Sequence, residues 1–296
     1  RKLGKTEENG KKTAKNWKMW LYRPLRDFVS SCEPSLRGFA SSREPHSTSG
    51  SRIVYIPVLP ALTTSTPGAT PLMARVIAIA NQKGGVGKTT TAVNLAASLA
   101  IAEKRTLLID ADPQGNASSG VGVARGQVRL SLYDAVIDER PARDIILHDE
   151  SLPFLHILPA TQDLVGAELE LVDRPNRETA LRRALEPIMD DYDFILIDCP
   201  PSLGLLTLNV LTAAHAVIIP IQCEYYALEG ISQLLNTIRL VQQNFNPGLA
   251  IDGVLLTMFD TRINLARQVA NDAREYFGPG VFRTVIPRNV RLAEAP

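Results

Sequence analysis

The sequence predicts an α/β fold in which a doubly wound, mostly parallel sheet has helices on both faces. From residue 73 onward, short apolar runs alternate with segments whose apolar residues recur at helical spacing. The runs are continuously apolar, which is typical of parallel strands buried on both faces. With 296 residues, of which 45% are hydrophobic and 21% charged, the chain is long enough to bury such a core.

The predicted elements follow one another in a regular order. A strand over residues 75–80 leads into a glycine-rich loop and then a helix over residues 91–102. Further strands are predicted over residues 106–109, 154–158, 194–197, 216–219 and 254–257. Further helices are predicted over residues 178–189, 205–214, 228–243 and 265–277. No internal repeat interrupts this order, so residues 73–296 are expected to form one domain.

Residues 1–72 have a different composition. They hold 12 Lys and Arg against 5 Asp and Glu, whereas residues 73–296 hold 20 against 26. They lack apolar periodicity and are rich in Ser, Thr, Pro and Gly, which is typical of a segment that buries too little apolar surface to order. We expect a disordered N-terminal extension or an upstream frame translated in error, with Met73 as the native start. A basic arm that binds nucleic acid is a further alternative.

Cysteine spacing and hydropathy indicate the cellular compartment in which the protein is expected. Cys32, Cys199 and Cys223 form no CxxC pair, which favours reduced thiols over a disulfide framework or a metal cluster. No apolar run approaches the roughly 18–20 residues that cross a bilayer, so no membrane span is expected. The first residues are too basic for a secretory signal. We therefore expect a cytoplasmic protein.

The loop after the first strand carries a phosphate-binding motif in a deviant form. The general pattern is GxxxxGK[ST], and Gln82 stands at its first glycine position. The loop reads Lys83-Gly84-Gly85-Val86-Gly87-Lys88-Thr89-Thr90. Its glycines let backbone N–H groups turn toward phosphate oxygens at the positive end of the next helix. We expect Lys88 to reach the β- and γ-phosphates and Thr89 to ligate Mg²⁺.

Acidic residues follow two of the predicted strands. Asp110 and Asp112 come after the strand over residues 106–109, and Asp198 follows the strand over residues 194–197. Ligands of open α/β sheets lie outside the carboxyl ends of strands, so these acids should converge on the phosphate loop. Asp198 has the position of an acid that orients Mg²⁺, usually through a water. Capping or turn formation is the alternative for Asp110 and Asp112.

Four sequence blocks, in this order, resemble those of the ParA/Soj chromosome-partitioning ATPases. They are residues 81–91 (NQKGGVGKTTT), 110–116 (DADPQGN), 193–202 (DFILIDCPPS) and 287–296 (PRNVRLAEAP). The resemblance covers residues 73–296 and none of residues 1–72. It implies a nucleoid-associated ATPase that uses ATP and Mg²⁺, dimerises on ATP, binds DNA without sequence preference and hydrolyses ATP when a ParB-like partner stimulates it.

The resemblance also implies roles for single residues. Lys83 matches the signature lysine, which crosses a dimer interface to the phosphates of the partner's nucleotide. Asp112 matches the acid that orients the attacking water, and Asp110 lies nearer the metal. Pro287 and Asn289 are implied to line the adenine pocket.

A DNA-binding surface is expected among basic residues in the second half of the domain. The candidates are Arg262, Arg267, Arg274, Arg288 and Arg291. Since acids outnumber bases over residues 73–296, the sequence indicates a local basic patch with salt-sensitive binding. Ordinary solvated arginines are the alternative for each position.

Other functions stay open at this point. A MinD-like positioning ATPase shares the deviant loop and binds membrane through a C-terminal helix. A nucleotide-switched scaffold with little turnover is a second alternative. An iron–sulfur carrier of the same fold is disfavoured because it needs cysteine ligands. The sequence stops at Pro296, inside the fourth block, so we expect the C-terminal end of the fold to be missing.

Overall fold

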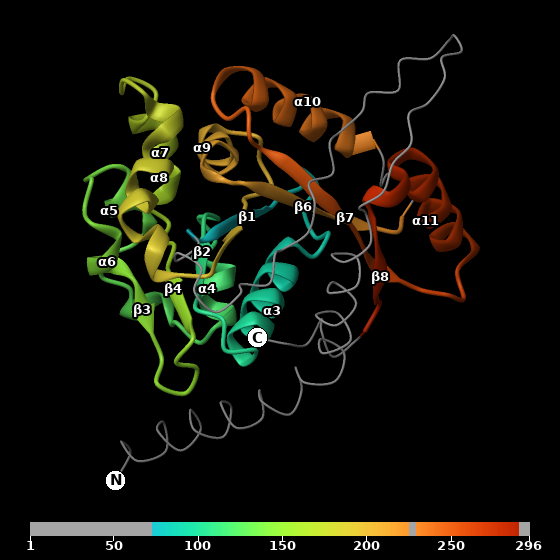
Figure 1. Ribbon diagram of the computed structural model, residues 1–296, viewed down its shortest axis with the longest axis horizontal. Coiled ribbons are helices and arrows are strands. Elements are labelled where there is room, and N and C mark those ends of the chain that lie inside the picture. The colour runs from blue at the N-terminus through green and yellow to red at the C-terminus, as the bar shows by residue number, and fades with distance from the viewer. Residues whose placement is uncertain (1–72, 225–228, 290–296) are drawn as a thin grey trace, which may run out of the picture.

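An eight-stranded sheet lies between layers of helices (Figure 1). The computed structural model describes residues 73–224 and 229–289. The strands are β1 Arg75–Ile79, β2 Thr106–Asp110, β3 Leu147–His148, β4 Leu155–Leu158, β5 Phe194–Asp198, β6 Ala216–Gln222, β7 Ala250–Phe259 and β8 Val281–Pro287. Their order is β3-β4-β2-β5-β1-β6-β7-β8, and among these described strands only the β3–β4 pair is antiparallel. The predicted α/β class and mostly parallel sheet are confirmed.

The helices connect these strands and cover the sheet. The α-helices are α3 Lys88–Ile101, α4 Asn116–Gly120, α5 Leu132–Val136, α6 Ala142–Ile145, α7 Leu164–Glu170, α8 Ala180–Leu185, α9 Leu205–Ala213, α10 Glu229–Asn244 and α11 Asn264–Phe277. Short 3₁₀ turns are η2 Arg125–Gln127, η3 Arg177–Thr179, η4 Glu186–Asp191 and η5 Gly278–Gly280. Figure 1 shows α5 to α8 gathered at the β3–β4 end of the sheet and α11 at the β8 end.

The central strands are buried on both faces, which explains their continuous apolar sequences. Successive side chains of a strand point to opposite faces. In β5, Ile195 and Ile197 join the core formed with α8, α9 and α10, while Leu196 joins the core beneath α3. Two cores therefore hold the sheet rigidly between them.

The predicted elements differ from the structure at a helix that is interrupted and at a strand that was not predicted. The helix expected over residues 178–189 is interrupted and consists of η3, α8 and η4. Pro187 lies in η4, where it lacks the N–H that an α-helix needs and crowds the preceding turn. The strand β8 was not expected, because its alternation is weak and Arg283 interrupts it. Its pairing with β7 is a long-range contact that sequence periodicity does not encode.

Several expectations fall outside the described residues. These include all statements about residues 1–72, the end of the fourth block and the role of Arg291. Within the described ranges, no helix is long and apolar enough to cross a membrane.

Candidate functional site

The phosphate loop joins the end of β1 to the start of α3 at the middle of the sheet. Gly85 has a φ of 71° and Gly87, which precedes the first turn of α3, has a φ of 88°. These left-handed conformations favour glycine. A Cβ placed on Gly84 or Gly85 would meet no atom within 4 Å. The outer face of the loop is therefore open.

Two side chains fix the loop to neighbouring strands. Asn81 Nδ2 donates to the Pro220 carbonyl of β6 at 2.6 Å, and Asn81 Oδ1 accepts from the Lys83 N–H at 3.0 Å. The Thr257 hydroxyl of β7 donates to the Val86 carbonyl at 2.8 Å. The sequence analysis assigned no role to Asn81 or Thr257. Asn81 belongs to the first block, whereas Thr257 lies 171 positions from its partner and offers no local signal.

Lys88 is the buried cation of the site. Its Nζ donates to the Lys83 carbonyl at 3.2 Å. Burial lowers the pKa of Lys88, and the charges of Asp198 and Asp112 oppose that change. A desolvated ammonium group forms strong, charge-assisted hydrogen bonds with phosphate oxygens.

Asp110 ends β2 and bonds to the helix that follows. Its Oδ2 accepts from both the N–H and the hydroxyl of Ser118 at 2.7 Å, and its Oδ1 accepts from the Asp112 N–H at 3.2 Å. Burial raises the pKa of Asp110, and these bonds oppose the rise. Asp110 thus caps the first turn of α4, and capping is the role given above as the alternative to a functional one. Its contact with a metal stays a prediction.

Asp112 lies in the turn after β2, close enough to Lys88 for their charges to interact. Its Oδ1 accepts from the Gln114 N–H at 2.9 Å, and its carbonyl accepts from the Gly115 N–H. These bonds fix the direction of a largely buried carboxylate.

Asp198 is fully buried at the end of β5, opposite Asp110 in the strand register. Neither of its carboxylate oxygens makes a hydrogen bond of good geometry, although the Thr89 hydroxyl is near enough to favour the ionised form. Burial raises the pKa of Asp198 to about 8, and the charges of Asp110 and Asp112 contribute. A buried carboxylate without hydrogen bonds destabilises the folded state unless a cation or a hydrogen-bond donor binds it.

The unsatisfied oxygens of Asp198 and the nearby Thr89 hydroxyl fit a hard cation such as Mg²⁺. In the part of the chain that the structure describes, no cluster of three or more His, Cys, Asp or Glu side chains could hold a metal ion. Any ion here needs further ligands from phosphates and water. Mg²⁺ sites in nucleotide-binding proteins are usually of this kind.

Lys83 extends from the open loop toward the end of β6. Its Nζ lies 3.8 Å from Glu224 Oε2, and Gln222 Nε2 donates to Glu224 Oε1 at 2.6 Å. Sequence reasoning did not identify Glu224 as a neighbour of the loop. Both charged side chains are partly exposed, so the ion pair is worth at most about 1 kcal/mol.

The remaining predicted residues lie at the β7–β8 end of the sheet. Pro287 ends β8 opposite Phe259, Asn289 follows it, and both are exposed. The Arg262 guanidinium donates two hydrogen bonds to Asp260 and the Arg262 backbone N–H donates a third. The pKa of Asp260 falls to about 2 because of these bonds and, to a smaller extent, the charge of Arg288. Arg262 and Arg288 therefore lie near one carboxylate.

The other two arginine candidates in the described residues lie on α11. Arg267 donates to Asn264, and Arg274 is exposed in the last turn.

Known proteins share the sequence and the fold. Residues 74–251 match the family described as AAA domain. The chromosome partitioning protein ParA of Myxococcus xanthus is 60% identical over 222 residues, which cover 75% of this chain and 78% of that protein. The sporulation initiation inhibitor protein Soj of Bacillus subtilis is 58% identical over 224 residues, which cover 76% of this chain and 88% of that protein.

A solved structure shares the fold of this chain. Cobyrinic acid a,c-diamide synthase from Mycobacterium smegmatis, with bound ADP and magnesium, superposes with a TM-score of 0.70 at 42% identity. The match covers 75% of this chain and 91% of that one. The motifs, the sheet order and these relatives agree, and the chain belongs to the ParA/Soj family of chromosome-partitioning ATPases.

Proposed function

We propose that this protein is a DNA-partitioning ATPase that dimerises on ATP, holds DNA without sequence preference and hydrolyses ATP when a ParB-like partner stimulates it. The observation that carries the proposal is the convergence of Lys88, Asp112 and Asp198 beside an open glycine loop. Partition activity requires DNA binding, so the protein is expected to associate with the nucleoid.

ATP and Mg²⁺ are the cofactors that the site fits. Loop N–H groups and Lys88 would hold the phosphates, while Thr89 and Asp198 would hold the ion. Bound Mg²⁺ neutralises charge on the phosphate oxygens. The ADP and magnesium of the Mycobacterium smegmatis structure agree with this expectation.

Asp112 is the residue to which we assign orientation of the attacking water. The Gln114 N–H fixes one carboxylate oxygen of Asp112, and the second oxygen remains available to accept a proton or a hydrogen bond from water. Lys88 lies close enough for its positive charge to interact with this carboxylate. Hydrolysis then depends on a correctly placed water rather than on a covalent intermediate.

Dimerisation is supported by the open face of the loop. Gly84 and Gly85 place no side chains there, and the weak ion pair with Glu224 leaves Lys83 free to exchange a carboxylate for a phosphate. A second cation at the γ-phosphate would stabilise the charge that develops during hydrolysis. ATP binding, pairing and turnover are therefore coupled in this proposal.

Replacing Lys83 with Ala tests the coupling. We expect Kd for ATP to change by less than about threefold, because Lys88 still holds the phosphates, while ATP-dependent dimerisation is lost. Nucleotide fluorescence measures the first quantity and sedimentation velocity the second. The exposed Lys104→Ala is the matched control. A Lys83→Ala protein that dimerises at the parent concentration would contradict the proposal.

Turnover distinguishes a partition ATPase from a nucleotide-switched scaffold. ATP hydrolysis by the full chain is measured alone, with duplex DNA and with a ParB-like protein. Stimulation by DNA and partner together supports the partition function. A measurable basal rate that neither addition changes would favour another function for the same site.

A further inference from the structure

Charge is distributed unevenly along the sheet. Residues 131–173, which include α5 to α7, β3 and β4, hold 10 Asp and Glu against 2 Lys and Arg. Residues 260–288, which include α11 and β8, hold 3 Asp and Glu against 5 Arg. These segments lie at opposite ends of the sheet (Figure 1). If the basic end faces DNA, the acidic end faces away from it.

The acidic end carries an exposed apolar stripe on α7 and the turn after it. Val165 is 60% exposed, Leu169 75% and Val172 50%. Their spacings of four and three residues place them on one face, which we call the α7 stripe. The opposite face of α7, with Leu164 and Ala167, is buried in the core. Within residues 73–224 and 229–289, the fold therefore leaves this second apolar face uncovered.

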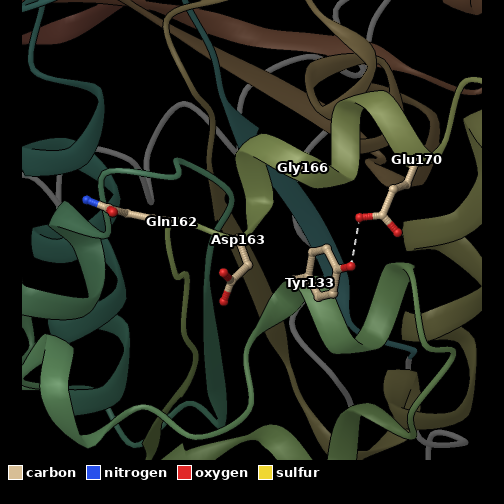
Figure 2. A pocket seen from close by; sticks show the side chains of 5 residues that line it. All are labelled: Tyr133, Gln162, Asp163, Gly166 and Glu170. Carbon is tan, nitrogen blue, oxygen red and sulfur yellow. Dashed lines mark hydrogen bonds between the residues drawn. The ribbon is translucent and has the colours of Figure 1, made fainter.

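An acidic groove adjoins the stripe on the same helix. Tyr133, Gln162, Asp163, Gly166 and Glu170 line it, with a volume of about 420 Å³ (Figure 2). The Tyr133 hydroxyl from α5 donates to Glu170 Oε1 at 2.8 Å. Carboxylates therefore border the exposed apolar side chains, and the groove complements positive charge.

We propose that the α7 stripe and this groove bind a cationic amphipathic segment of a partner protein. Its apolar face would cover Val165 and Leu169, while its Lys or Arg side chains would meet Asp163 and Glu170. A second copy of this chain docked through the same surface would bring two acidic ends together. The inference rests on the proposed function, because it gives the stimulating partner a docking site.

Helix α7 and the loop before it contact the helices α4 and α9, which follow the two acid-bearing loops of the nucleotide site. The Ala160 N–H, in the loop before α7, donates to the Ser118 hydroxyl at 3.2 Å, and that hydroxyl bonds to Asp110. Glu168 on α7 accepts from the Leu206 N–H at 3.4 Å, at the start of the helix that follows the Asp198 loop. A segment that shifts α7 would thus alter the surroundings of both carboxylates.

A labelled synthetic amphipathic helix of Leu and Lys, about 14 residues or four turns long, tests the docking site on the full chain. Fluorescence anisotropy should show saturable binding that Leu169→Ser weakens about tenfold. Leu240→Ser, at a leucine 58% exposed on α10, should change affinity by less than about twofold. Glu170→Gln should weaken binding about threefold and Glu275→Gln should not, since only Glu170 lines the groove.

Three outcomes would overturn the docking site: no saturable binding, equal effects of Leu169→Ser and Leu240→Ser, or loss of ATP-dependent dimerisation in Leu169→Ser without peptide. The last would identify the stripe as an interface between copies. Equal peptide affinity with and without ATP would refute coupling to the nucleotide site. Basal ATP hydrolysis without peptide tests the proposed function separately, so a failure of either hypothesis is distinguishable.

Discussion

Asp198 is the residue whose surroundings most clearly require a ligand. Its carboxylate is fully buried, lacks well-formed hydrogen bonds and lies near Asp110 and Asp112. Lys88 offsets part of this repulsion. The site therefore stores an unfavourable electrostatic arrangement that a divalent cation would relieve.

Replacing Asp198 with Asn should stabilise the nucleotide-free protein at alkaline pH. The pKa of Asp198 is about 8 in the folded chain, against about 3.9 in the unfolded chain. The folded chain thus binds the extra proton between about pH 4 and 8, so stability falls as pH rises through this window and levels off above it. The asparagine side chain carries no charge, so the fall should be smaller in the variant.

Thermal melts in EDTA from pH 5 to 9 measure the effect of Asp198→Asn. The exposed Asp173→Asn is the control. Parallel curves for parent and Asp198→Asn would contradict the assigned burial penalty. In the presence of Mg²⁺ and ATP, the parent should be more stable than Asp198→Asn, because the variant lacks the carboxylate that would hold the ion.

Asp112→Ala should separate ATP binding from hydrolysis. Because Lys88 and the loop remain, the variant should bind ATP and dimerise, while turnover falls about 10²–10⁴-fold. Single-turnover hydrolysis and sedimentation with ATP measure the two properties. Asp173→Ala, at an exposed carboxylate outside the nucleotide site, serves as control. Parent-rate hydrolysis by Asp112→Ala would remove Asp112 from the mechanism.

At the scale of elements, the phosphate loop takes its shape from strands that follow it by more than a hundred residues. Asn81 ties its entry to β6, and Thr257 ties Val86 to β7. Gly87 lies beside Thr257, since a Cβ there would be in ordinary van der Waals contact, 3.8 Å from Thr257 Cγ2. The sheet therefore preorganises the loop before nucleotide binds.

Thr257→Val should weaken this preorganisation. The substitution keeps the volume but leaves the buried Val86 carbonyl without its donor, at a cost of about 1–3 kcal/mol in unfolding free energy. Denaturant unfolding measures the loss, and ATP affinity should fall with it. Thr237→Val removes only a solvent-exposed hydrogen bond within α10 and should be nearly neutral. Equal losses in both variants would argue against a specific support.

Sequence patterns predicted the long, strongly apolar elements better than the short ones. The helices α4, α5 and α6 have four or five residues each, too few for a helical period to appear. The acids and glycines of the site lie next to predicted strands and were found. Asn81, Ser118, Thr257 and Glu224 were not, because their roles depend on contacts between distant segments.

At the scale of the whole molecule, the charge separation along the sheet gives the proposed DNA binding a direction. Arg262 and Arg288 lie at the basic end, although Asp260 partly neutralises them. A patch of this kind favours weak, salt-sensitive contacts with phosphates. In the proposed function, the acidic end would stay accessible to partners while the other end holds DNA.

Arg288→Glu should weaken DNA binding and leave ATP binding unchanged. Loss of one phosphate contact and added repulsion should lower affinity about tenfold and flatten its dependence on salt concentration by roughly one unit of slope. Filter binding at several salt concentrations measures both. Arg140→Glu, exposed at the acidic end, is the control. Equal weakening in both variants would place the DNA elsewhere.

The sequence by itself determined the α/β class, the phosphate loop, its acidic neighbours and membership of the ParA/Soj family, because these depend on local periodicity and on contiguous motifs. Only the tertiary structure decided that Thr257 and Asn81 hold the loop, that Asp110 bonds to Ser118 and that Asp198 makes no hydrogen bond of good geometry. It also decided that acidic and basic segments lie at opposite ends of one sheet. Such facts depend on strand order, which brings distant residues together and which no local pattern records.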